Sequence, residues 1–249
     1  MNDQLDRAYE FLLEGDMRGE RSEPSRFGVA VFHDALPLRY DSNYLLLDRL
    51  PATVAAGDLV AEAARLGRPE VMVRDEATGE RLAPGFERHG WKVHRGLVMA
   101  HRRPATRTAD TGLVREVDEA LLRPAHRREL AGYPWATPEV VEQLLDAKLA
   151  IARAVTARFL AVVVDGEVAA YADLYHDGRT AQVEDVATLP EHRGRGYASA
   201  LVLRALEEAR LAGCDFAFLV ADAEDWPKEL YRRLGFEDLG RYVKFIHPD

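Results

Sequence analysis

An anion-binding turn is indicated by the sequence PEHRGRGYA at residues 190–198. A strand-like run (181–189) precedes it, and residues 198–211 continue with the apolar spacing of an amphipathic helix. The first amides of a helix have no partner within the helix, and together with the positive end of its dipole they attract anions. Gly194 and Gly196 permit a tight turn and close approach of a ligand. The segment predicts a pyrophosphate site; the alternative is a strand–helix connection with solvated arginines.

Two common phosphate loops do not explain this turn. It lacks the Lys-Ser/Thr of a Walker-type loop, and the full G-x-G-x-x-G of a dinucleotide fold is absent. Its chemistry therefore depends on the elements around it.

The elements that must position the turn follow a mixed α/β pattern. Periodicity in the second half predicts the order β-α-α-β-β-β-α-β-α-β, and Asp165-Gly166 is typical of a hairpin turn. This order favours a mixed, mostly antiparallel twisted sheet flanked by helices, with hairpins first and a crossover later. The strands are predicted at 113–117, 159–164, 168–175, 181–189, 216–220 and 236–246, and the helices at 119–130, 138–155, 198–211 and 226–234.

Residues 102–112 (RRPATRTADTG) are polar, contain Pro and Gly, and form the best linker candidate. We therefore divide the chain into a smaller N-terminal α/β domain (1–103) and a second domain (112–249). The first has strand-like runs at 28–32, 44–47, 71–73 and 91–101, and helical patterns at 5–13, 52–66 and 79–89.

A faint internal repeat aligns Gly-Trp at residues 90–91 with Gly-Phe at residues 235–236. Phe86 then falls at the position of Tyr231. The repeat predicts that the first domain is a degenerate copy of the second, without a phosphate turn. It would complete the fold, cover a surface or form a homodimer.

The net charge of −9 argues against nucleic acid as a partner, since phosphate binding needs a basic surface. No apolar run approaches the roughly 20 residues of a membrane span, and the N-terminus lacks a signal-peptide core, so we expect a cytoplasmic protein without a membrane partner. One cysteine, Cys214, is too few for a disulfide or a thiolate zinc site, and no metal is expected.

With both motifs considered, residues 112–249 resemble the GNAT superfamily of acetyl-CoA-dependent N-acetyltransferases. The family hallmark Arg/Gln-x-x-Gly-x-Gly/Ala corresponds to RGRGYA at 193–198, and the family's Tyr-x-x-x-Gly-Phe corresponds to residues 231–236. The resemblance also covers the predicted order of elements. It implies transfer of an acetyl group from acetyl-CoA to a primary amine, by direct attack in a ternary complex.

The resemblance further implies which residues bind the co-substrate. Backbone amides of the turn would hold the pyrophosphate, a serine hydroxyl would assist, and the preceding strand would pair with the pantetheine arm next to a bulge. The implied cofactor-binding residues are Val186, Thr188, Arg193, Gly194, Arg195, Gly196, Tyr197, Ala198 and Ser199.

Two catalytic residues are implied in the same way. Tyr231 begins the second motif and would act as the acid near the CoA sulfur. Glu184 would accept the amine proton, or alternatively would bind the amine cation without taking the proton. Strand alternation places Gln182, Glu184 and Val186 on one side and Asp185 on the other, and a bulge would reverse that parity.

The acceptor pocket is expected among the first two helices and the hairpin strands of the second domain. Its candidate residues are Tyr133, Trp135, Tyr171 and Asp173, with His126 and Tyr175 beside them. The acceptor, a small-molecule or peptide amine, stays open. Two alternatives are a non-catalytic acyl-CoA-binding regulatory module of the same fold, and a transferase of a longer acyl group.

Overall fold

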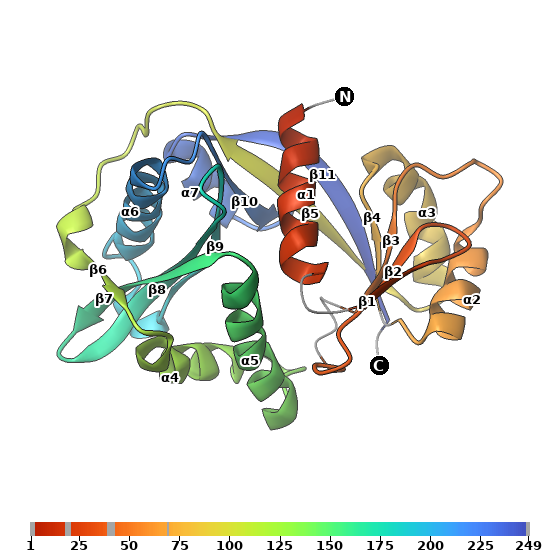
Figure 1. The fold of residues 1–249 in the computed structure, drawn as a ribbon, viewed down its shortest axis with the longest axis horizontal. Coiled ribbons are helices and arrows are strands. Elements are labelled where there is room, and N and C mark those ends of the chain that lie inside the picture. The colour runs from red at the N-terminus through yellow and green to blue at the C-terminus, as the bar shows by residue number, and fades with distance from the viewer. Residues whose placement is uncertain (1–2, 18–20, 39–42, 69, 248–249) are drawn as a thin grey trace.

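The computed structural model describes residues 3–17, 21–38, 43–68 and 70–247. Within these residues the strands form one 11-stranded sheet with the order β1-β2-β3-β4-β11-β5-β10-β9-β8-β7-β6 (Figure 1). The sheet is mixed and mostly antiparallel, as the sequence predicts, with parallel pairs at β3–β4 and β9–β10.

The elements alternate along the chain in the predicted α/β manner. The strands are β1 (Arg21–Pro24), β2 (Val29–Phe32), β3 (Tyr44–Leu47), β4 (Glu70–Val73), β5 (Lys92–His101), β6 (Val114–Val117), β7 (Thr156–Val164), β8 (Glu167–His176), β9 (Thr180–Thr188), β10 (Phe216–Asp222) and β11 (Phe236–Ile246). The helices are α1 (Asp3–Met17), α2 (Ala56–Leu66), α3 (Glu76–Arg88), α4 (Glu119–Leu130), α5 (Pro138–Ala154), α6 (Tyr197–Leu211) and α7 (Pro227–Arg233), with the 3₁₀ helices η2 (Thr111–Leu113) and η3 (Pro190–His192).

Several helices of the first half differ from their predicted bounds, and one strand was not predicted. The predicted helix at 52–66 begins later, at Ala56, because Val54 closes a turn onto Pro51 and the Asp58 side chain accepts from the Ala55 amide at the helix start. Strand β1 falls in a stretch whose charges gave no strand signal; it is exposed and pairs with β2.

The two halves exchange their last strands at the middle of the sheet. Strand β5 lies between β10 and β11, and β11 lies between β4 and β5. The element order β3-α2-β4-α3-β5 of the first half recurs as β9-α6-β10-α7-β11 in the second. In both series the first two strands are parallel, and the middle strand then pairs antiparallel with the last strand of the other series.

Helices cover both faces of this sheet (Figure 1). Helix α6 and α7 residues pack with Leu97, Met99 and Leu219 on one face. The alternate residues of the same strands, including Val98 and Phe218, point to the other face and pack with α1 there. Figure 1 shows α1 lying across the middle of the sheet, between the halves. Among the described residues no helix combines the length and the apolar character needed to cross a bilayer.

Candidate active site

The turn at residues 193–196 joins η3 to the start of α6. Gly194 has φ 78° and Gly196, which caps α6, has φ 83°. L-residues seldom adopt this left-handed region, which explains the glycines. A Cβ added at either glycine would have no other atom within 4 Å, so the space in front of the turn is open. The turn and the first amides of α6 form a nest with room for an anion.

The side chains of this turn differ in how far they are exposed to solvent. Arg193 and Arg195 are exposed, and the Arg193 Nε donates to the Thr188 carbonyl at 3.2 Å. Tyr197 and Ala198 are half-buried at the first turn of α6, whereas Ser199 is 2% exposed. The two arginines are therefore open to solvent, whereas Ser199 is enclosed by the protein.

A gap opens between β9 and β10 after Gln182 and continues toward this turn. The two parallel strands pair over Thr180–Gln182 and Phe216–Phe218. Further along, β9 continues to pair with β8 as far as Thr188, while β10 pairs on its other edge with β5. The predicted residues Val186 and Thr188 thus lie on a strand edge that faces the gap. Backbone groups on such an edge can bind an extended ligand as an additional strand.

A β-bulge interrupts β9 where the gap opens. Tyr171 pairs with Ala187 and Asp173 pairs with Glu184, so Asp185 and Val186 together oppose one residue of β8. Asp185 has φ 51°, unusual for a residue with a side chain. The expectation that Asp185 faces away from Glu184 is therefore wrong. The bulge rotates it so that Gln182, Glu184 and Asp185 all line one cavity, and Val186, expected beside Glu184, packs on the α6–α7 core instead.

The environment of Glu184 suits a base that works near neutral pH. Burial, and then the negative charge of Asp185, raise its pKa to about 8, although the Gln182 amide donates a hydrogen bond to its carboxylate. A carboxyl with an ordinary pKa of 4.5 would bind a proton too weakly to remove one from an ammonium group.

Tyr231 lies on α7 across the gap from this carboxylate pair. It is 9% exposed and packs edge-to-face on Phe236, with 6.2 Å between ring centroids. Burial raises its pKa to about 12, and the charges of Glu184 and Asp185 contribute. Tyr231 belongs to the α6–α7 face of the core, whereas Glu184 lines a cavity on the α1–α5 face. The two predicted catalytic side chains therefore flank the gap from opposite faces.

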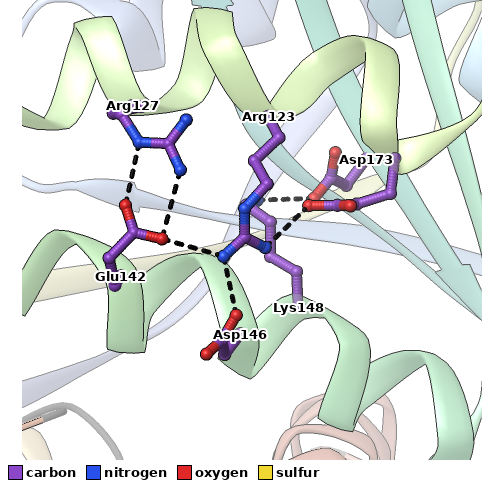
Figure 2. Close-up of polar contacts among 7 residues, drawn as sticks. Arg123, Arg127, Glu142, Asp146, Lys148 and Asp173 are labelled. Carbon is purple, nitrogen blue, oxygen red and sulfur yellow. Dashed lines mark hydrogen bonds and ion pairs between the residues drawn. The ribbon is translucent and has the colours of Figure 1, made fainter.

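Lys148 of α5 anchors the bulge through its ion pairs with Asp173 and Asp185. Figure 2 shows Lys148 beside Asp173. Its Nζ lies 2.7 Å from Asp173 Oδ2 and also pairs with Asp185, while the Tyr175 hydroxyl donates to Asp173 at 2.8 Å. Burial alone would lower the pKa of Lys148, but the two carboxylates outweigh it and hold the pKa above its ordinary value. Asp173, at 0% exposed, thus fixes Lys148, and through it Asp185.

Of the other predicted pocket residues, Tyr175 bonds Asp173 directly, whereas Tyr171, His126, Tyr133 and Trp135 make their ring contacts elsewhere. Tyr171 is 2% exposed, and its ring centroid lies 4.1 Å from that of buried His126, whose pKa falls to about 3 because of burial and the charge of Lys148. Tyr133 and Trp135 stack on each other after α4, at 5.2 Å, and each is 44% exposed. They form an aromatic pair at the surface.

Comparison with known proteins identifies the family of the second half. A profile of the Acetyltransferase (GNAT) family matches residues 116–236, which run from β6 through α6 to the start of β11. The second half of the chain is a GNAT acetyltransferase domain. A curated relative, the uncharacterized N-acetyltransferase CgeE of Bacillus subtilis (strain 168), is 35% identical over 72 residues. That match spans 29% of this chain and 28% of the relative.

Solved structures extend the likeness of fold to both halves. A GCN5-related N-acetyltransferase from Kribbella flavida has a TM-score of 0.67 and 22% identity, with 100% of this chain and 97% of that chain covered. A tandem GNAT protein from the clavulanic acid biosynthesis pathway has a TM-score of 0.50 and 14% identity, with 98% and 94% covered. At these identities the likeness concerns the fold alone.

Sequence reasoning about the GNAT domain missed Lys148 and the contribution of the first half. Lys148 carried one weak signal, a lone cation on an α5 face that is otherwise apolar at Val141, Leu145 and Ala147. Cys214 is half-buried, and burial raises the pKa of its thiol. That direction disfavours the thiolate that a nucleophile needs.

We expect Lys148→Met to destabilise the fold by about 3 kcal/mol, because it leaves the buried Asp173 carboxylate without its cation. Arg127→Met is the control: Arg127 pairs with Glu142 between α4 and α5, but this pair is exposed and should contribute less than about 1 kcal/mol (Figure 2). Urea unfolding of both variants measures the difference. Equal losses would contradict a structural role for the Lys148–Asp173 pair.

Proposed function

We propose that this protein is an N-acetyltransferase that uses acetyl-CoA and a primary amine. One observation carries the proposal: an open glycine turn at the start of α6 stands beside a strand edge that faces a gap. A pyrophosphate fits the nest at Gly194–Gly196, and an extended pantetheine chain fits the β9 edge near Val186 and Thr188. Bound acetyl-CoA would supply an activated acetyl thioester.

Two side chains flank the gap, and each takes part in the proton transfers. Glu184, with its raised pKa, accepts a proton from the ammonium form of the acceptor, which leaves a neutral nitrogen able to attack. As the carbon–sulfur bond breaks, Tyr231 donates its phenolic proton to the leaving thiolate, and the second proton that the nitrogen loses on forming the amide restores the phenol. A direct attack needs no nucleophile from the protein, and holding both substrates together supplies much of the acceleration.

We also infer that the first half is a degenerate copy of the GNAT domain. Its support is the recurrence of the strand–helix order and of the pairing directions in both halves. The connection from β3 to α2 lacks the paired glycines of the β9–α6 turn, and Phe86 lies on α3, in the position that Tyr231 takes on α7. The proposed chemistry therefore takes place in the second half.

A panel of amines tests the activity. Thiol release from acetyl-CoA is followed with a thiol-reactive chromophore, using aryl and alkyl monoamines, polyamines, amino acids and peptides. Acetyl transfer predicts thiol release that depends on one class of amine. Tight CoA binding without release for any amine would favour a regulatory binding module, and faster release from longer acyl-CoAs would move the donor assignment to a longer chain.

Within this scheme Tyr231→Phe should lower kcat about 10- to 100-fold and leave the Kd of acetyl-CoA unchanged. The substitution removes one hydroxyl and keeps the ring that packs on Phe236. Steady-state kinetics and calorimetric titration measure the two quantities. A parallel loss of CoA affinity would show that the hydroxyl binds the co-substrate and does not act as the acid.

A further inference from the structure

A cavity of about 260 Å³ lies where the two halves meet, between α1, α5 and the sheet. The first half contributes apolar side chains to it from three elements, among them Leu12 of α1, Leu46 of β3 and Met72 of β4. The GNAT domain contributes Leu144 of α5 and the acidic pair Glu184 and Asp185. The proposed base therefore faces a chamber with a large part of its wall built by the non-catalytic half.

The charged side chains around this chamber differ in whether an opposite charge is already paired with them. Arg74 is held by Asp48 with two contacts of 2.7 Å, and Lys244 pairs with Glu70 at 2.9 Å. Asp185 is paired with Lys148. Glu184 differs, because the contact it accepts comes from the neutral Gln182 amide. The chamber thus offers apolar walls and a single acidic end, where β9 and β10 diverge.

This arrangement distinguishes among classes of acceptor. A polyamine or an aminoglycoside carries several cations, and most of them would lose water against apolar walls without a carboxylate in return. An amine with one cationic group can place that group at Glu184 and its apolar body against α1, β3 and β4. The volume is close to the lower end of the roughly 300–1,000 Å³ of small-molecule pockets, which suits a small molecule.

We propose that the first half forms the acceptor pocket, and that the acceptor is a primary monoamine with an apolar body, such as an arylalkylamine or an alkylamine. This inference rests on the proposed acetyltransferase function. It gives the first half a role in substrate choice, and it makes Leu12, Leu46 and Met72 specificity-determining residues.

The probe is 2-phenylethylamine, with spermidine as the polycationic comparison. Leu12→Trp fills the cavity from α1, and Leu144→Trp repeats the test from α5 should the first variant fold poorly. Leu206→Trp is the matched control, because Leu206 is a partly buried leucine of α6 that packs on the opposite face. Calorimetric titration of each protein with 2-phenylethylamine, in saturating CoA, measures binding without turnover.

We expect wild type and Leu206→Trp to bind 2-phenylethylamine equally, and the two cavity variants to bind it at least about 10-fold more weakly. KM in thiol release should rise by the same factor. A wild-type preference for spermidine, or cavity variants that bind 2-phenylethylamine like wild type, would overturn the acceptor inference and leave acetyl transfer intact. Absence of thiol release for every amine in the panel would instead overturn the proposed function.

Discussion

Gly196→Glu should weaken acetyl-CoA binding by at least about 1,000-fold. The residue has φ 83°, so any side chain strains the turn, and the new carboxylate would stand in the open space in front of the α6 amides. Its negative charge would occupy the nest and repel a pyrophosphate. Calorimetric titration with acetyl-CoA measures the loss, and turnover at fixed co-substrate should fall in proportion.

Gly178→Glu provides the matched control. Gly178 lies in the turn between β8 and β9, has φ 87°, and also has open space where a Cβ would be. It therefore carries the same backbone strain and the same added charge outside the proposed site. CoA affinity should stay within about twofold of wild type. Equal losses in both variants would attribute the effect to general strain and refute a pyrophosphate site at residues 193–198.

Glu184→Gln should lower kcat/KM by about 100- to 10,000-fold, the range typical of a lost general base. In the wild type the deprotonated carboxylate is the active form and the pKa is about 8, so kcat/KM should rise with pH and level off above that value. Asp185→Asn removes a charge that raises this pKa. The rising limb should then move to lower pH. Because the amine is the same in both proteins, such a shift belongs to the enzyme.

The pH dependence of stability tests the pKa of Glu184 independently of catalysis. The pKa of Glu184 is raised from 4.5 to about 8, so the native state holds a proton that the unfolded state releases between these values. Stability from this group falls as pH rises through that window and stays low above it. Glu184→Gln should therefore melt at a higher temperature than wild type at pH 9. An unchanged pH profile in Asp185→Asn, or no stabilisation at pH 9, would contradict the assignment of this pKa.

Local signals in the sequence were sufficient to predict the strands and helices of the second half and the glycine turn. The strand–glycine–helix pattern at 190–198 depends on interactions within about ten residues, and the structure has the predicted strand, turn and helix there. Tyr231 could be placed on a helix before β11 for the same reason. The bulge at Asp185 was different, because its position follows from the exact register with β8 and from the contact with Lys148, 37 residues away in the sequence.

Long-range partners explain the rest of what sequence reasoning could not reach. Alternation along β8 gives Tyr171 and Asp173 one face, but it cannot reveal that Lys148 neutralises Asp173 or that His126 covers Tyr171. Periodicity predicted β5 and β11 as strands without indicating their neighbours. Their positions in the sheet depend on the other half of the chain.

The exchange of β5 and β11 has a consequence for how the protein is made. A ribosome completes the first half early, yet the edge of β4 that faces away from β3 has no neighbour until β11 emerges, more than 160 residues later in the sequence. The nascent chain must hold an exposed strand edge during most of translation, a state that favours chaperone binding and aggregation. Neither half expressed alone would have its full sheet. Co-expression of residues 1–103 and 112–249 as separate chains should restore the missing strands to each.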